Sequence, residues 1–249
     1  MDFKDKIIKL KEVDSTNIYA REILKKFPEI VEGTTIVASF QTSAQGQDGN
    51  YWESGKEQNI LLSIILHPEF LKPDQLFYLN ISVSLALYDF VESYNISDIK
   101  IKWPNDIYVG NKKIAGVLIH NDLEYSSVRN SIIGIGININ QDKFNPDIPN
   151  PISLKNIINK ESDLNVCLEI LLNCIEKRYN ILKNMDFEGI YTEYHKTLYL
   201  LGQESLFLDN NRGEEFQGII DGVRSDGRIR IITPQGIRFF EFREVKYIF

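Results

Sequence analysis

Residues 100–116 have the sequence KIKWPNDIYVGNKKIAG, and the fold of the central part of the chain depends on them. Alternating apolar residues at 99–103 predict a strand that ends at Pro104, because proline has no N–H to donate to a neighbouring strand. Gly110, which asparagine follows, is a strong turn signal, and residues 112–119 have the pattern of a returning strand. The stretch therefore predicts short strands joined as hairpins.

A polar insertion, Asn105-Asp106, interrupts the apolar pattern of this predicted hairpin. The hairpin would bring Lys102, Asp106 and Lys113 close together. One interpretation is a β-ribbon with solvated lysines, in which the aspartate caps a turn or pairs with Lys102. The particular order, Lys-Trp-Pro-Asn-Asp followed by Lys-x-Ala-Gly, instead favours a functional site, because reactive groups are commonly held between buried strands.

The composition is that of an ordinary globular protein: 249 residues, of which 43% are hydrophobic and 25% are charged. Such a length accommodates one large domain and one small domain. The net charge of −7 argues against sequence-independent nucleic-acid binding, which needs clustered lysine and arginine. There is no apolar run of signal-peptide or membrane-spanning length. We therefore expect a cytoplasmic protein with no membrane and no nucleic-acid partner.

The two cysteines, Cys167 and Cys174, lie on one predicted helix. Two helical turns separate them by roughly 10 Å, which is too far for a disulfide. We expect small buried residues there, and no metal site in the chain.

The apolar and polar pattern of the remaining chain predicts an α+β fold, in which helices pack on a mixed β-sheet. After Gly202 the pattern changes to short β-runs separated by turn residues, which predicts a small barrel. We expect domains at residues 1–201 and 202–249. The other predicted strands are 6–13, 34–40, 59–66 and 131–140, and the predicted helices are 18–27, 75–94, 154–159, 165–184 and 187–199.

The block at 102–106, with KIAGVLI at 113–119, resembles the catalytic domain of biotin–protein ligases within the biotin/lipoate ligase family. Further matches run from about Val13 to the C-terminus. The resemblance implies a class II synthetase-like catalytic domain and an SH3-like β-barrel, in a form without the N-terminal DNA-binding domain. It also implies formation of biotinyl-5'-AMP from biotin and ATP with Mg²⁺, followed by transfer to a lysine of a biotin carboxyl carrier domain.

The resemblance also implies the site residues. Ser15, Thr16 and Asn17 would line the biotin pocket, although by themselves these residues favour an ordinary helix cap, with which the pocket is compatible. Catalysis is expected from Lys113, Asp106 and Lys102. Biotin binding is expected from Ser15, Thr16, Asn17, Gln41, Ala44, Gln45, Lys113 and Gly116, and nucleotide binding from Gln45, Gly46, Gln47, Trp52, Asn105, Lys113 and Asn138.

The glycine-containing loop at 41–54 departs from the family pattern Gly-Arg-Gly-Arg-x-Gly-Arg-x-Trp. Composition alone is equally compatible with an ordinary surface loop. Gly46, Gly49 and Trp52 match, whereas Ala44 replaces the first glycine. Gln45, Gln47 and Asn50 stand where arginines are usual, and Asp48 adds a negative charge.

Two rival functions stay open at this stage. The missing arginines favour a biotin-binding sensor with weakened catalysis, and a lipoate or octanoate ligase would share the architecture. The protein is expected to be a monomer or a weak homodimer.

Overall fold

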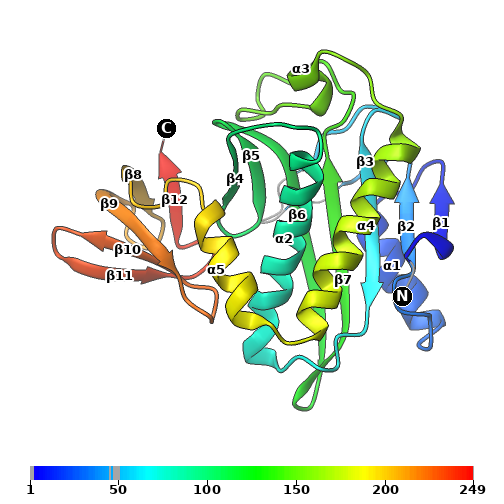
Figure 1. Cartoon of the computed structure of the whole chain (residues 1–249), viewed down its shortest axis with the longest axis horizontal. Coiled ribbons are helices and arrows are strands. Elements are labelled where there is room, and N and C mark those ends of the chain that lie inside the picture. The colour runs from blue at the N-terminus through cyan, green and yellow to red at the C-terminus, as the bar shows by residue number, and fades with distance from the viewer. Residues whose placement is uncertain (1–2, 45, 47–50, 249) are drawn as a thin grey trace.

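The computed structural model describes residues 3–44, 46 and 51–248, which form a seven-stranded and a five-stranded sheet with helices around the larger one (Figure 1). The elements are 3₁₀-helix η1 (Phe3–Asp5), β1 (Ile7–Leu10), α1 (Thr16–Lys26), β2 (Thr35–Ala38), β3 (Ile60–Leu66), 3₁₀-helix η3 (Pro73–Gln75), α2 (Leu76–Glu92), β4 (Ile99–Lys102), β5 (Asp106–Val109), β6 (Lys112–Glu124), β7 (Ser127–Ile137), α3 (Leu154–Ile158), α4 (Leu164–Lys183), α5 (Phe187–Thr197), β8 (Glu204–Asp209), β9 (Glu214–Val223), β10 (Ile229–Thr233), β11 (Gly236–Phe240) and β12 (Val245–Ile248).

The larger sheet has the strand order β1-β2-β3-β7-β6-β5-β4. Its strands pair antiparallel except for β1 and β2, which are parallel, so the sheet is mixed as predicted. Helices α2, α4 and α5 cover the face toward the viewer in Figure 1, where most of the buried core lies. Helix α1 packs in a smaller cluster with β2, β3 and β7. Two-sided coverage explains why every residue of β3 is buried.

The alternation of side chains along β7 separates two environments. Ile133, Ile135 and Ile137 belong to the core that contains the α2 residues. The intervening Gly134 and Gly136 face the other way, and Gly136 pairs with Gly116 of β6. Glycine leaves the sheet surface bare on that face, so another group can approach the backbone closely.

The three large helices are joined by a charge network around Arg178 of α4. Its guanidinium donates to both carboxylate oxygens of Asp89 on α2, at 2.7 and 2.6 Å. It also donates to both carboxylate oxygens of Glu193 on α5, at 2.6 Å each. These hydrogen bonds hold the pKa of Glu193 below its usual value, although burial opposes them. The planar guanidinium has five N–H donors, and four of them are used in this two-sided contact.

The smaller sheet is antiparallel throughout, in the order β11-β10-β9-β8-β12, which agrees with the predicted barrel-like domain. It joins the larger sheet partly through Trp103, whose indole N–H donates to the Gly227 carbonyl at 2.9 Å. The Pro104 carbonyl accepts from Tyr194 of α5 at 3.0 Å and from Asn80 of α2 at 3.1 Å. Hydrogen bonds to the smaller domain and to helices α2 and α5 therefore fix the turn after β4. The boundary at residues 201 and 202 stays a prediction, and it falls between α5 and β8.

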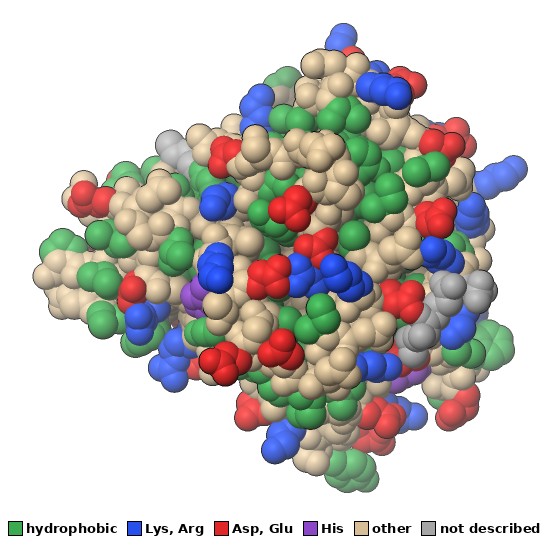
Figure 2. All heavy atoms as spheres, viewed as in Figure 1, with side chains coloured by type: hydrophobic (Ala, Val, Ile, Leu, Met, Phe, Trp, Pro, Cys, Tyr) green, Lys and Arg blue, Asp and Glu red, His purple; other side chains and the backbone are tan. Residues whose placement is uncertain are grey.

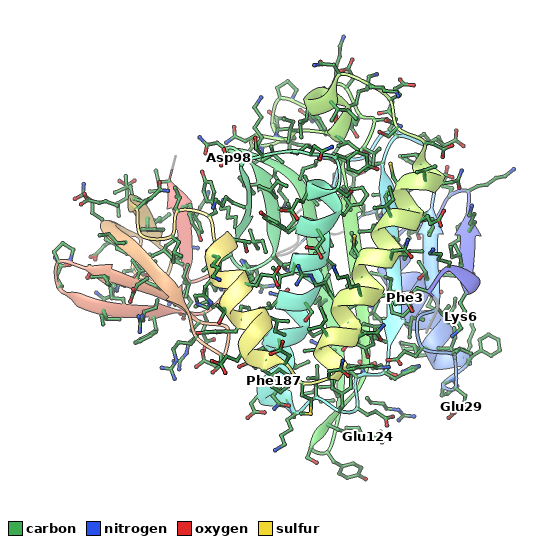
Figure 3. All side chains as sticks on the ribbon, in the orientation of Figure 1. Phe3, Lys6, Glu29, Asp98, Glu124 and Phe187 are labelled. Atoms are coloured by element: carbon green, nitrogen blue, oxygen red, sulfur yellow. The ribbon has the colours of Figure 1, made fainter. Side chains whose placement is uncertain are left out.

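The outer surfaces are mixed in character. On the face shown in Figure 2, acidic and basic side chains are interspersed over the helices. Figure 3 shows Glu124 at the far end of the β6–β7 hairpin, away from the smaller sheet. Within the described ranges, no helix is long and apolar enough to cross a lipid bilayer.

Candidate active site

A cavity of about 430 Å³ lies over the glycine-bearing face of the large sheet. Its walls come from the start of α1, from β5, β6 and β7, and from β12 of the smaller sheet. The predicted site residues among its lining are Ser15, Thr16, Asn17, Gln41, Gly46, Trp52, Lys102, Asp106, Lys113 and Gly116.

Lys113 and Asp106 form an ion pair in this cavity, with 2.8 Å between Nζ and Oδ1. Their side chains are 30% and 28% exposed, so each still reaches the cavity. A Cβ atom on Gly116 would lie 3.1 Å from Asp106 Oδ1 and 3.2 Å from Lys113 Nζ. Glycine at this position therefore gives the pair its room.

A β-bulge between β5 and β6 turns Lys113 toward the cavity. Asp106 pairs with Gly116, but the register shifts so that Tyr108 pairs with Lys113. Regular alternation from Gly116 would put residue 113 on the opposite face, because side chains alternate with period two. The displaced backbone is anchored by hydrogen bonds from Lys113 N–H to the Asn150 carbonyl, 2.7 Å, and from Ile152 N–H to the Lys113 carbonyl, 3.0 Å.

Lys102 occupies an unusually apolar environment for a cation. Its Nζ lies 5.0 Å from the ring centre of Tyr108 and 4.7 Å from that of Tyr247. Burial lowers its pKa to about 8, an effect that Lys113 and Lys246 reinforce and that Asp106 opposes. Cationic and neutral forms of this lysine are thus both accessible near neutral pH.

The start of α1 presents polar groups to the cavity. Ser15 is the N-cap residue, yet its side chain makes no capping hydrogen bond. Instead Gln41 Oε1 accepts from the Thr16 amide at 2.6 Å. Ser63 donates to the Thr16 hydroxyl at 2.8 Å, and Asn17 donates to the Leu118 carbonyl at 3.3 Å. These hydrogen bonds fix the start of α1 in the wall of the cavity. The Ser15 hydroxyl does not take part in capping the helix.

Trp52 lies directly over bare backbone. A Cβ atom on Gly136 would be 2.5 Å from Trp52 Cε2, so the indole or the backbone would have to move. Lys113 Nζ is 5.5 Å from the centre of the indole. The indole therefore forms a flat apolar wall beside the ion pair, a surface suited to a planar ring.

Three predicted residues are not part of the described lining. Ala44 is buried outside it. Asn105 donates to the Val117 carbonyl at 3.0 Å, and Asn138 donates to the Ile152 carbonyl at 3.1 Å. Both amides fasten backbone segments, although their buried Oδ1 atoms have no hydrogen-bond partner among the described residues. Gln45 and Gln47, with Asp48 and Asn50, lie outside the described residues.

The cavity lining also includes residues of the smaller sheet and its connections that were not predicted from the sequence. These are Asn210 and several residues around β12, namely Phe242, Arg243, Val245, Lys246 and Tyr247. They are far from the signature block in sequence, and no motif marks them. Only the docking of the two sheets brings them together with Lys102.

Comparison with known proteins gives the family. A model of the biotin/lipoate A/B protein ligase family matches residues 10–138. The bifunctional ligase/repressor BirA of Bacillus spizizenii is 30% identical over 233 residues, covering 91% of this chain and 69% of the relative. The chain belongs to the biotin/lipoate A/B protein ligase family.

More specific similarities lie with biotin–protein ligases. The biotin–[acetyl-CoA-carboxylase] ligase of Paracoccus denitrificans is 25% identical, over 95% of this chain and 98% of that protein. The biotin protein ligase from Aquifex aeolicus, solved with biotin and ATP, has a TM-score of 0.80 and 28% identity over 98% of this chain and 99% of that one. The predicted fold class, the membership of this family and the enzyme class are thereby confirmed. The chain spans 69% and 64% of the length of the BirA proteins of Bacillus spizizenii and Bacillus subtilis.

Proposed function

We propose that this protein activates biotin with ATP to biotinyl-5'-AMP and transfers the biotinyl group to a lysine of a biotin carboxyl carrier domain. The observation that most strongly supports this proposal is the charge of the cavity. Its described lining contains one carboxylate, that of Asp106, and four cationic side chains, which are Lys102, Lys113, Arg243 and Lys246. A cationic cavity in a chain of net charge −7 suits two anionic substrates that must meet.

In the first half-reaction a biotin carboxylate oxygen attacks the α-phosphorus of ATP. A new P–O bond forms, the bond to the bridging oxygen of the β-phosphate breaks, and pyrophosphate leaves. Negative charge gathers where the two substrates meet, and Lys113 is the cation proposed to stabilise it. Lysine offers three donors to several oxygens at once. Trp52 is proposed to hold the adenine ring against its flat face.

The start of α1 is proposed to hold the other end of biotin. Ser15 and Thr16 offer hydroxyls and Asn17 an amide, which match the polar groups of a ureido ring. Gln45 and Gln47 remain proposed nucleotide contacts through hydrogen bonds without charge.

Mg²⁺ is proposed to arrive with the nucleotide. Among the described residues there is no group of three histidine, cysteine or carboxylate side chains suited to a metal ion. Magnesium commonly binds through one or two carboxylates and substrate phosphates, and Asp106 is already paired with Lys113. The residues present therefore fit an ion carried by phosphates, which would neutralise the leaving group.

In the second half-reaction the carrier lysine attacks the acyl carbon of the adenylate. A C–N bond forms, the C–O bond to phosphate breaks, and AMP leaves. The attacking amine must lose a proton, and Asp106 is proposed to orient it and to accept that proton. The Asp106 side chain is partly exposed and lines the cavity, where the carrier lysine is proposed to enter.

Intact-mass measurement after incubation with biotin, Mg-ATP and a carrier domain is the direct test. A gain of one biotinyl group on the carrier supports the proposal. Biotin-dependent exchange of pyrophosphate into ATP distinguishes the enzyme from a sensor that binds biotin without turnover. Equal competition by lipoate or octanoate for the cavity would point to the other branch of the family.

A further inference from the structure

The smaller sheet supplies one wall around a lysine of the larger sheet. Lys102 ends β4, and its ammonium lies between the rings of Tyr108 on β5 and Tyr247 on β12. Nζ also donates to the Tyr108 hydroxyl at 3.3 Å. We call Lys102, Tyr108 and Tyr247 the lysine cage.

The cage is a rigid part of the junction between the sheets. Tyr108 and Tyr247 are 6% and 7% exposed. Tyr199, which follows α5, lies against both rings, with centroid distances of 5.4 and 6.3 Å. Phe207 of β8 meets Tyr247 edge-on at 5.5 Å. Aromatic packing against Tyr199 and Phe207 therefore restricts how far either ring can turn.

We propose that Tyr247 is a positioning residue for catalysis, which acts across the domain junction by holding the Lys102 ammonium in the cavity. The inference rests on the proposed ligase function. It adds a residue of the smaller sheet to the machinery of adenylate formation.

The physical argument is that Lys102 needs its charge and its direction at the same time. A buried ammonium tends to lose its proton or to move toward water. The ring of Tyr247 attracts the cation through its quadrupole without neutralising it, and the Tyr108 hydroxyl accepts a hydrogen bond from it, whereas a carboxylate would compete with phosphate oxygens. Tyr247 therefore keeps Lys102 both cationic and directed toward the substrates.

The cage has a consequence for pH dependence. Replacing Tyr247 with leucine keeps an apolar neighbour and removes the ring, so the protonated form of Lys102 loses stabilisation and its pKa falls below about 8. Adenylate formation that needs the cation would then decline at a lower pH than in the wild type. The other charged or titratable groups around the ammonium are Asp106 and Tyr108 on β5, Lys113 on β6, and Lys246 on β12.

The test is the pH profile of biotin-dependent pyrophosphate–ATP exchange in the full chain. Tyr247→Leu should shift the alkaline limb down by about half a unit to one unit and lower the rate at pH 9 by about three- to tenfold. Tyr247→Phe keeps the ring and should restore both values. Phe240→Leu, a similar change in the buried core of the smaller sheet, should leave the alkaline limb in place.

A double-mutant cycle tests whether Tyr247 acts through Lys102. In a Lys102→Ala background, Tyr247→Leu should change the exchange rate by less than about twofold. Equal slowing in both backgrounds, or a Phe variant as slow as the Leu variant, would overturn the inference.

A measurement without substrate separates this inference from the proposed function. NMR titration of lysine side-chain nitrogens, with the Lys102 signal assigned from Lys102→Arg, gives the Lys102 pKa directly. A lower pKa in Tyr247→Leu but not in Tyr247→Phe supports the cage even if the wild type shows no exchange. The same pKa in all three proteins rejects it, and absence of exchange in the wild type rejects the proposed ligase activity alone.

Discussion

Lys113 Nζ lies 2.8 Å from Asp106 Oδ1, and the bulge between β5 and β6 puts both side chains on the cavity side of the sheet. Both are partly exposed, and exposed ion pairs contribute only about 0–1 kcal/mol to stability. The pair therefore positions its members more than it stabilises the fold. It places a cation and a potential base within one hydrogen bond of each other.

Lys113→Ala should lower adenylate formation on the order of 10²-fold or more, because it removes a positioned cation where negative charge gathers. Pyrophosphate release measures this step. Lys112→Ala is the matched control, since Lys112 is the exposed neighbour on the same strand. A Lys113→Ala rate within about threefold of the wild type, which is less than 1 kcal/mol, would rule out this assignment.

Asp106→Asn should slow transfer to the carrier lysine more than adenylate formation, since the amide cannot accept the proton of the amine. Single-turnover measurement of each half-reaction separates the two effects. Asp98→Asn serves as the control in the same hairpin, because Asp98 is exposed and is not in the described cavity lining. Equal slowing of both half-reactions would assign Asp106 a structural role.

Gly136→Ala should displace the indole of Trp52, because the added Cβ would lie 2.5 Å from Cε2. Nucleotide binding should weaken on the order of tenfold or more, since a displacement of about 1 Å at a site is costly. Isothermal titration measures the affinity, and a thermal melt checks the fold. In a Trp52→Ala background the same glycine substitution should have little further effect, and a full additional loss would show that Trp52 is not the group displaced.

Much of the fold was predictable from local pattern. The buried β3 and the helix α2 follow from apolar runs with clear end signals at His67-Pro68 and Pro73. The predicted hairpin is present as β4, β5 and β6. These predictions succeeded because the period of apolar residues is set by which face of an element is buried.

The site was predictable only in part, for two physical reasons. The bulge that turns Lys113 depends on the pairing of two strands, and a one-residue shift has no signature in either strand alone. The positions of Asn105 and Asn138 depend on which backbone carbonyl each amide meets, namely those of Val117 and Ile152. The family resemblance predicted that Asn105 and Asn138 belong to the site, but it did not predict the direction of their side chains.

Arg178→Ala should lower the free energy of unfolding by about 3 kcal/mol, because it leaves Asp89 and Glu193 without their shared partner. We expect the lower end of the range for buried pairs, since the Glu193 side chain is 45% exposed. Denaturant titration measures the change. Arg129→Ala, which breaks an exposed pair with Glu124, should leave the midpoint near that of the wild type. Equal midpoints for both variants would contradict the network's role.

The double change Gln45→Arg with Gln47→Arg should slow dissociation of biotinyl-AMP and lower the apparent KM for ATP. Arginine adds charge where the amide offers a neutral hydrogen bond, and a charge-assisted bond is roughly twice as strong. Stopped-flow dissociation beside the wild type is the measurement. Unchanged or faster dissociation would indicate that backbone N–H groups around Gly46 and Gly49 make the contacts instead.

The cavity is assembled from α1 near one end of the chain and from β12 near the other. A molecule with the large sheet folded but the smaller sheet undocked would lack the cavity wall that Val245, Lys246 and Tyr247 form. A ligand that contacts both walls binds the docked form more tightly, so it favours docking by mass action. A ligand of this cavity is therefore expected to raise the stability of the docked smaller sheet as well as to occupy the site.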